Sequence, residues 1–256
     1  MNTREASTRI EAVLLDVEGT TTPIAFVVDV LVPYARKHVR RHLEELAASP
    51  IAASVLDQLR ELHAVDQRAG ESVAAWVDAP LRARLDSAAS YAEWLMDRDR
   101  KSTPLKTLQG ALWEVGYQRG ELVGEVFADV PTALARWQAA GVQVGIFSSG
   151  SVLAQQLLFR HSSAGDLTPF LRWYFDTTTG KKTDPDSYRR IAAAMNTRPE
   201  SIMFLSDVVV ELDAARAAGL ATRLSIRPGN VPPPLPHDHP AIRTFDDFTS
   251  THSGSP

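Results

Sequence analysis

The stretch IEAVLLDVEGTTTP, residues 10–23, decides the fold that this sequence predicts. Its first seven residues are mostly apolar and end at Asp16, which is typical of a buried strand in a parallel sheet. The remainder contains Gly19 and Pro23 and favours a loop. The sequence therefore predicts an early strand whose carboxyl end carries two acidic residues, Asp16 and Glu18.

Helical and alternating patterns divide the rest of the chain. A helical pattern over residues 26–48 turns Arg36, Lys37, Arg40 and Arg41 towards water, and further helices are predicted at 51–68, 80–96 and 105–116. Later helices are predicted at 131–140, 151–160, 184–195 and 208–218, and strands at 142–147, 173–175, 202–205 and 220–226. This alternation predicts an α/β fold with a parallel sheet. Residues 1–25 and 126–256 then form the sheet domain, and residues 26–125 are a helical insertion.

Composition narrows the class of protein further. With 256 residues and 44% hydrophobic content the chain can bury a core, and its net charge of −4 is too small to attract nucleic acid or an anionic membrane. The absence of cysteine excludes disulfides, thiolate metal sites and cysteine nucleophiles. No apolar run approaches the ~18 to 20 residues that span a bilayer. We expect a soluble cytoplasmic protein and, without an evident helical seam for self-association, a monomer.

Two further features give weaker indications. Residues 227–240 hold six of the 16 prolines, which predicts an extended surface connection, with a Pro-rich ligand for a partner domain as the alternative. His63, His161, His237 and His239 show no metal-binding spacing, and we expect His237 and His239 to be solvated.

Polar side chains follow the predicted strands where each strand ends. They are Asp16 and Glu18; Ser148, Ser149 and Gly150; Lys182, in a loop before a helix; and Ser206, Asp207 and Glu211. Because the carboxyl ends of parallel strands meet at one edge of a sheet, where ligands bind, we expect these groups to converge.

The set is chemically coherent if the ligand is a phosphate. Asp16 and Asp207 supply the hard oxygen ligands that Mg²⁺ prefers. Ser148, with the N–H groups that open the next helix, forms an anion cradle, and Lys182 neutralises charge on a transferring phosphoryl group. Asp16 is the candidate nucleophile, through an aspartyl phosphate, and Glu18 the candidate general acid and base.

Each group also has a non-catalytic interpretation. Asp16 and Glu18 are compatible with a solvated turn, and Ser148 and Ser206 with helix caps. A loop lysine usually faces solvent, and Glu211 can simply complement a helix dipole. The order of the groups along the chain, rather than any single one, favours the phosphate site.

That order, D-x-E-G-T, S-S-G, a loop lysine and S-D-x-x-x-E, resembles the haloacid dehalogenase superfamily of phosphotransferases. The usual first motif there is D-x-D-x-T, so Glu18 is a departure. Longer stretches resemble the enolase-phosphatase family of methionine salvage over nearly the whole chain. They are DVEGTTTPIAFVVDVLVPYA (16–35), MDRDRKSTPLKTLQGALWEVGYQRGEL (96–122), IFSSGSVLAQQLLF (146–159), FDTTTGKKTDPDSYRRIA (175–192) and FLSDVVVELDAARAAG (204–219).

The resemblance implies a Rossmann-like catalytic core, with the insertion as an all-helical cap that closes over the site. It implies an enzyme with one Mg²⁺ per subunit that enolises 2,3-diketo-5-methylthiopentyl-1-phosphate and then dephosphorylates it to an acireductone. By motif position, Asp16, Asp207 and Glu18, through its side chain or backbone carbonyl, bind Mg²⁺. Ser148, Ser149 and Lys182 contact substrate; Lys182 is preferred to Lys181 because the family's lysine is second after the glycine, here Gly180.

Several alternatives stay open. The base for enolisation is not assigned. Arg100 and Lys101 either contact substrate from the cap or are surface charges, and Trp76, Trp94 and Trp113 either bound a methylthio pocket or belong to the core. The alternative functions are a phosphatase for another phosphorylated metabolite, without enolisation, and a non-enzymatic receiver-like module.

Overall fold

The computed structural model describes residues 9–46, 50–233 and 235–247, and the chain divides into two compact units. The sheet unit comprises residues 1–27 and 123–256, and the helical unit residues 28–122. The sequence placed these junctions at 25/26 and 125/126. Each unit is described by itself below.

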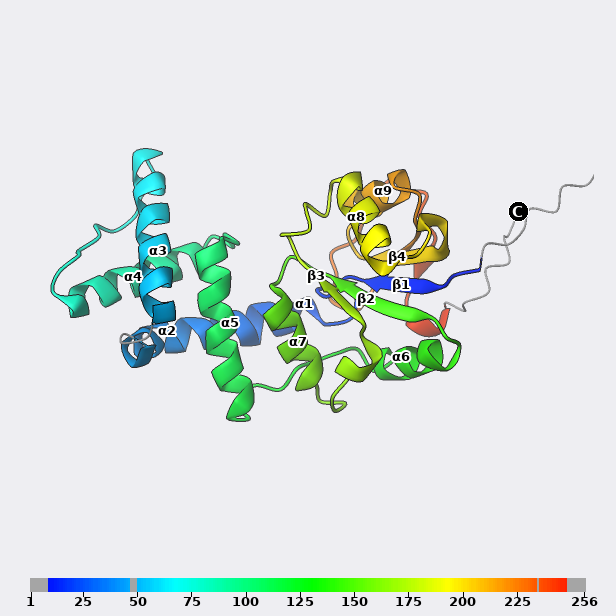
Figure 1. The fold of residues 1–256 in the computed structure, drawn as a ribbon, viewed down its shortest axis with the longest axis horizontal. Coiled ribbons are helices and arrows are strands. Elements are labelled where there is room, and N and C mark those ends of the chain that lie inside the picture. Colours follow the sequence, from blue (N-terminus) through cyan, green and yellow to red (C-terminus); the bar gives the residue numbers. More distant parts are fainter. Residues whose placement is uncertain (1–8, 47–49, 234, 248–256) are drawn as a thin grey trace, which may run out of the picture. The chain divides into compact units, whose positions relative to one another are not determined.

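The sheet unit is built on a six-stranded parallel sheet with the order β3-β2-β1-β4-β5-β6 (Figure 1). The strands are β1 (Ala12–Leu15), β2 (Gln143–Phe147), β3 (Trp173–Phe175), β4 (Ile202–Ser206), β5 (Ala221–Ser225) and β6 (Ala241–Ile242). Every residue of β1 and β4 is buried, as expected for central strands covered on both faces. The α/β fold class predicted from the sequence is confirmed.

Helices cover both faces of this sheet. The helices α8 (Pro185–Met195) and α9 (Val209–Ala217) lie on one face, and α6 (Val130–Ala139) and α7 (Val152–Arg160) lie on the other (Figure 1). On the first face, Tyr188 and Leu212 pack with Leu14 and Phe204 of the central strands in one hydrophobic core. Short 3-10 turns lie at Thr168–Phe170, Pro199–Ser201 and Phe245–Asp247.

The helical unit has a hydrophobic core of its own. Its helices are α2 (Val32–Leu46), α3 (Pro50–Arg68), α4 (Leu81–Met96) and α5 (Thr103–Gln118). The core includes Val39, Leu59, Leu95 and Leu108, one from each helix, and these side chains are at most 3% exposed. The described part of the unit contains no strand, as the sequence predicted.

The predicted helix over residues 26–48 differs from the structure in its first turns. Helical structure begins with α1 (Ile24–Phe26), and a π-helical segment, Val27–Leu31, precedes α2. Pro33 has no N–H to donate to the carbonyl of Asp29, which interrupts the α-helical bonding at that point. The last two residues of the prediction, 47 and 48, lie outside the described residues.

The Pro-rich segment is more tightly attached than a surface connection would be. The described residues between 227 and 240 form no helix or strand, but Arg227 is 5% exposed and His239 4%. His239 contacts Thr222 Oγ1 through Nδ1 (2.8 Å) and Asp213 Oδ1 through Nε2 (3.0 Å). The prediction of a solvated His239 is therefore wrong, because the ring ties the segment to β5 and α9.

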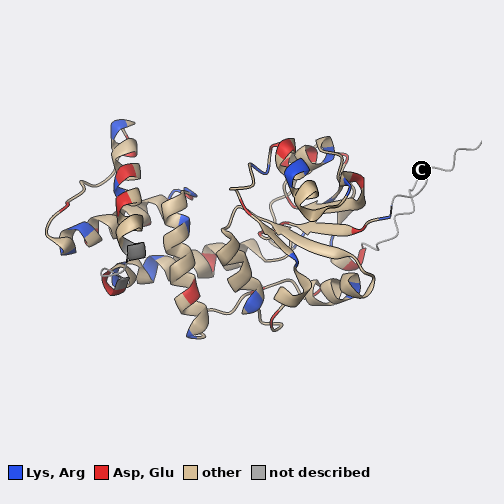
Figure 2. Ribbon diagram, viewed as in Figure 1, with Lys and Arg blue, Asp and Glu red and all other residues tan. Residues whose placement is uncertain are grey.

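Charged residues of both signs are interspersed over the described helices (Figure 2). Arg36, Lys37, Arg40 and Arg41 are exposed, as predicted, and Arg40 pairs with Glu93 at 3.2 Å. Among the described helices, none is both long enough and apolar enough to cross a membrane.

Candidate active site

The strand register brings the polar residues to one edge of the sheet. Leu15 of β1 pairs with Ile146 of β2 and with Leu205 of β4, so Asp16 follows at the level where the two neighbouring strands end. Because β1 lies where the chain order of the strands reverses, this edge is the usual ligand position in an open parallel sheet.

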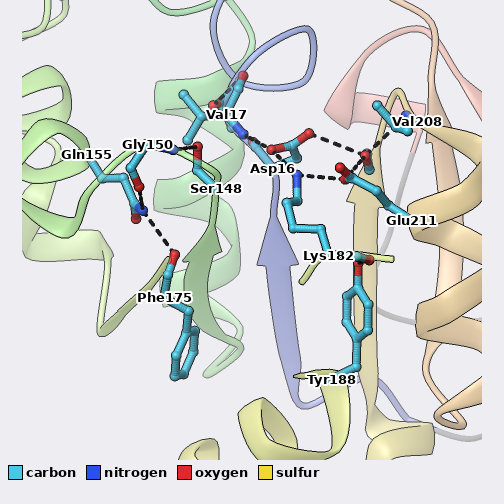
Figure 3. A network of polar contacts seen from close by, with 12 residues as sticks. Asp16, Val17, Ser148, Gly150, Gln155, Phe175, Lys182, Tyr188, Val208 and Glu211 are labelled. Atoms are coloured by element: carbon cyan, nitrogen blue, oxygen red, sulfur yellow. Dashed lines mark hydrogen bonds and ion pairs between the residues drawn. The ribbon is translucent and has the colours of Figure 1, made fainter. Parts of the chain in front are cut away.

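Asp16 forms a buried ion-pair network with Lys182 and Glu211 (Figure 3). Lys182 Nζ lies 2.6 Å from Asp16 Oδ1 and 2.6 Å from Glu211 Oε2. Asp16 Oδ1 also accepts a hydrogen bond from the N–H of Val17 at 2.7 Å. Ser206 Oγ lies 3.3 Å from Asp16 Oδ2 and 3.0 Å from Glu211 Oε2. The ammonium group is thus held between two carboxylates at the end of the central strand.

Ser148 and the start of α7 lie beside this network. Ser148 is 3% exposed, and its Oγ accepts a hydrogen bond from the N–H of Gly150 at 3.1 Å. Gln155 braces the turn, because its Nε2 donates to the carbonyls of Gly150 and Phe175, each at 2.9 Å. Ser149 is half-buried in the same turn. This turn precedes a helix N-terminus, which favours an anion.

Asp207 packs against the loop that carries Glu18. A Cβ built on Gly19 would lie 2.4 Å from Asp207 Oδ2, so only a glycine allows the loop to approach this carboxylate so closely. The φ of Gly19 is +71°, which also favours glycine. Asp16, Glu18 and Asp207 therefore lie in one neighbourhood at the end of β1 and β4.

The titration behaviour of the site reflects burial and an excess of negative charge. Burial, with the charges of Asp16 and Glu18, raises the pKa of Asp207 to about 6. Burial and the charge of Asp16 likewise raise the pKa of Glu211 to about 7, although Lys182 opposes the change. Burial alone would lower the pKa of Lys182, but its two carboxylate partners outweigh burial and raise it. Lys182 therefore carries its charge at neutral pH.

The donor set fits a magnesium ion. Among the described residues, no three His, Cys, Asp or Glu side chains are arranged to hold a metal by themselves. Mg²⁺ is usually bound by one or two carboxylates, with water and substrate phosphate oxygens completing the shell. Asp16, Glu18, Asp207 and Glu211 lie close together with Lys182 as their nearby cation, and a further cation would offset both the burial and the repulsion that raise the pKa of Asp207. The residues present therefore fit a divalent cation near Asp16 and Asp207.

The remaining predicted contact residues belong to the helical unit. Arg100 Nη1 pairs with Asp66 Oδ2 at 2.6 Å, and Lys101 Nζ lies 4.0 Å from Asp99 Oδ1. Trp76, Trp94 and Trp113 are partly buried against the core of the helical unit, which agrees with their core interpretation.

Three residues near the site were either not predicted from the sequence or were given no role by it. Tyr188 donates its hydroxyl proton to the carbonyl of Lys182 at 2.7 Å, and its ring packs against Phe147. Gln155 holds the turn after Ser148, and Glu211, whose role was open, pairs with Lys182. Tyr188 and Gln155 act on main-chain carbonyls, which leave no residue-type pattern in a sequence.

Comparison with known proteins defines the class first. The family model for haloacid dehalogenase-like hydrolases matches residues 10–219, which include every strand-end residue of the site. The chain is a haloacid dehalogenase-like hydrolase. Among solved structures it is similar to CbbY from Rhodobacter sphaeroides, with a TM-score of 0.54, 18% identity and coverage of 93% of this chain and 96% of that one, a likeness of fold alone.

More similar relatives define the family. The chain is 50% identical to enolase-phosphatase E1 of Synechococcus elongatus over 239 residues, 93% of this chain and 98% of that protein. It is 44% identical to enolase-phosphatase E1 of Drosophila melanogaster over 220 residues, 86% and 84% of the two chains. The crystal structure of UTR4 protein from Saccharomyces cerevisiae has a TM-score of 0.75 and 31% identity, covering 93% of this chain and all of that one. The chain belongs to the enolase-phosphatase E1 family.

Proposed function

We propose that this chain is an acireductone synthase, the Mg²⁺-dependent enolase-phosphatase of methionine salvage. It enolises 2,3-diketo-5-methylthiopentyl-1-phosphate and then removes phosphate to release 1,2-dihydroxy-3-keto-5-methylthiopentene. The observation that carries the proposal is the buried Asp16–Lys182–Glu211 network beside Asp207, in a chain 50% identical to a named enolase-phosphatase over 93% of its length. Residues 28–122 would be the cap insertion and the sheet unit the catalytic core.

The phosphatase step uses residues of the sheet unit. A carboxylate oxygen of Asp16 attacks phosphorus, and the bond from phosphorus to the substrate oxygen breaks while Glu18 supplies the proton that the leaving oxygen needs. Water then attacks the aspartyl phosphate, Glu18 takes the proton, and phosphate and free Asp16 result. Lys182 stabilises the charge on the transferring group, and the turn at Ser148 and Ser149 binds its oxygens.

The enolisation step uses the same electrostatics. A vicinal dicarbonyl loses a proton more readily when cations polarise its oxygens, and a positioned base adds about 10²- to 10⁴-fold. Mg²⁺, when bound, supplies Lewis-acid polarisation of oxygen in both steps. Asp16, Asp207 and Glu18 would hold it. Lys182 adds a buried positive charge, since its side chain is only 9% exposed.

The test uses the diketone phosphate, Mg²⁺ and the purified chain. Phosphate and ultraviolet absorbance are recorded together, and we expect a transient enol absorbance before phosphate appears. Phosphate release without that absorbance would point to a phosphatase for another phosphorylated metabolite. An aspartyl phosphate that survives for minutes would point to a receiver-like module. The matched control is Asp213→Asn, which changes a half-exposed carboxylate away from the site.

We further propose that the partner is this small phosphorylated substrate and that the chain acts as a cytoplasmic monomer. The exposed charges pair locally, as Arg40 does with Glu93, which supports a solvated surface. Size-exclusion chromatography with light scattering tests the monomer, for which a mass near 28.0 kDa is expected.

A further inference from the structure

A tight turn at the start of the Pro-rich segment reaches the loop that carries Glu18. The N–H of Asn230 donates to the carbonyl of Arg227 at 3.2 Å, which closes the turn. Pro228 and Gly229 occupy its two central positions, and the φ of Gly229 is +85°, as a type II turn requires. The first and last residues of such a turn lie close together, so the side chains of Arg227 and Asn230 can act on one target.

That target is a pair of successive carbonyl groups. Arg227 Nε donates to the carbonyl of Thr20 at 3.1 Å, and Asn230 Nδ2 donates to the carbonyl of Gly19 at 2.9 Å. The contacts join residues more than 200 positions apart in the chain. We call Arg227 and Asn230 the carbonyl clamp.

The arginine of the carbonyl clamp is itself held rigidly. Its side chain is 3% exposed, and its Nη1 contacts Asp129 Oδ2 at 2.8 Å and the carbonyl of Arg243 at 3.0 Å. The guanidinium carbon lies 4.7 Å from the ring centre of Phe127 and 4.4 Å from that of Phe245. A buried guanidinium with these partners has little freedom to move, so it makes a firm support for the loop.

The hydrogen bonds within the loop do not involve the carbonyls of Gly19 and Thr20, so these two groups need partners from outside the loop. The carbonyl of Val17 accepts the N–H groups of Thr20, Thr21 and Thr22 at 3.2, 3.0 and 2.9 Å, so the loop winds around one atom. The carbonyl of Thr22 accepts the N–H of Gly19 at 2.8 Å. The carbonyls of Gly19 and Thr20 are bound by the carbonyl clamp instead, which fixes the loop from the side of the Pro-rich segment.

The clamped position also packs against Asp207. A Cβ on Gly19 would lie 2.4 Å from Asp207 Oδ2 and 3.2 Å from Asn230 Nδ2, so these groups are packed together. Any shift of Gly19 moves Glu18, the residue before it, relative to Asp207. We infer that Arg227 and Asn230 are positioning residues that hold Glu18 in register with Asp207, and thereby set the affinity for Mg²⁺ under the function proposed above.

The test measures Mg²⁺ binding without substrate, by calorimetry on the full-length protein. Asn230→Ala removes one clamp contact, and Arg227→Lys keeps the positive charge beside Asp129 while losing the guanidinium geometry. We expect each variant to raise the Kd for Mg²⁺ by about tenfold, the usual scale for residues that orient metal ligands. The Mg²⁺ concentration for half-maximal turnover should rise by the same factor, while kcat at saturating Mg²⁺ changes less.

Two matched controls separate positioning from stability. Val231→Ala alters an 82% exposed residue of the same segment, and His239→Gln disturbs the segment's attachment to Thr222 and Asp213 away from the loop. Both should bind Mg²⁺ within twofold of wild type, although His239→Gln unfolds at a lower temperature. The inference is overturned if Asn230→Ala binds Mg²⁺ like Val231→Ala, if His239→Gln weakens binding equally, or if the wild-type chain does not bind Mg²⁺. A wild-type chain that binds Mg²⁺ but forms no enol or phosphate rejects the proposed function alone, because the binding comparison still decides the role of the clamp.

Discussion

At the scale of single residues, the proposed mechanism depends on the carboxylate of Asp16, which is held by several contacts. Asp16 is 4% exposed and is bound by Lys182 and by the N–H of Val17. Asp16→Asn keeps the shape of the side chain but replaces the proposed nucleophile with a neutral amide, which is also a poor metal ligand. We expect phosphate release to fall by at least about 10³-fold, as for other nucleophile substitutions. Steady-state phosphate assays check this, with circular dichroism to show an intact fold; turnover within tenfold of wild type would contradict the assignment.

Tyr188 gives a finer prediction about Lys182. Its hydroxyl donates to the carbonyl of Lys182, while its ring packs in the core with Phe147 and Phe204. Tyr188→Phe removes only the hydrogen bond, so we expect kcat to fall about 3- to 10-fold, the equivalent of roughly 0.5–1.5 kcal/mol. Lys182→Ala, measured alongside, should cost at least about 10²-fold. If both variants lose activity equally, or Tyr188→Phe loses none, the positioning role of the hydroxyl is wrong.

The sequence was sufficient to predict which candidate residues lie at one edge of the sheet, because their residue types suggested the proposed chemistry. Asp16, Ser148, Lys182 and Asp207 each follow a strand or precede a helix in an order that a parallel sheet brings to one edge. Asn230 gave no such indication, because it contacts the carbonyl of Gly19, which every residue type possesses. The residues that the sequence did not predict are therefore those whose side chains contact main-chain carbonyls.

At the scale of elements, the loop between β1 and α1 is limited by space as much as by backbone conformation. Gly19 and Gly141 have φ of +71° and +72°, but a Cβ on Gly19 would meet Asp207, whereas no atom lies within 4 Å of one on Gly141. We expect Gly19→Ala and Gly141→Ala to share a backbone cost of about 1–2 kcal/mol. Only Gly19→Ala should also lose Mg²⁺-dependent turnover. Denaturant unfolding and phosphate assays on both variants check this. Equal turnover in the two variants would show that the Asp207 side chain moves aside without loss of activity.

Within the helical unit, Asp66 ties α3 to α4 and to the segment after it. It is 5% exposed, accepts a hydrogen bond from Tyr91 and pairs with Arg100. Burial alone would raise the pKa of Asp66, but the bonds from Arg100 and Tyr91 outweigh it and lower the pKa. A lowered carboxyl pKa stabilises the fold above the unfolded pKa, and this contribution is lost as the pH falls through the folded value. Asp66→Asn should therefore cost about 1–3 kcal/mol at pH 7 and progressively less below pH 4. Denaturant titrations over this pH range measure it, and a pH-independent difference would contradict the ion-pair account.

Elements differ in how well their sequence predicts them. Long helices such as α8 show a clear apolar period, whereas β6 has only two residues and follows a Pro-rich stretch, so no alternation could reveal it. The π-helical segment, Val27–Leu31, lies inside a run with ordinary helical spacing. Its cause is the missing N–H of Pro33, a local effect that an apolar pattern does not register.

At the scale of the whole molecule, the net charge of −4 conceals a strong local imbalance. Asp16, Glu18, Asp207 and Glu211 lie near Lys182, so these five residues account for −3 of the net charge, and the charges of the other residues nearly cancel one another. Repulsion among these carboxylates costs stability in the metal-free fold, as is common where a site serves function rather than stability. Stability and metal binding should therefore respond in opposite directions when one of these carboxylates is neutralised.

Asp207→Asn tests that opposition. Because the pKa of Asp207 is raised to about 6, its ionised form at pH 7 costs stability, and the cost appears as the pH rises from the unfolded value through the folded one. In EDTA at pH 7 the variant should therefore be more stable than wild type, by up to about 2 kcal/mol. Mg²⁺ at about 100 times its Kd should add about 2.7 kcal/mol to the wild-type chain, which is roughly 5–11 °C in Tm, and almost nothing to the variant. Thermal unfolding in EDTA and in Mg²⁺, for both chains, measures all four values. A variant that is less stable than wild type in EDTA would contradict the stability cost of the ionised Asp207 carboxylate. A variant that gains as much stability from Mg²⁺ as wild type would show that Asp207 is not a ligand of the metal.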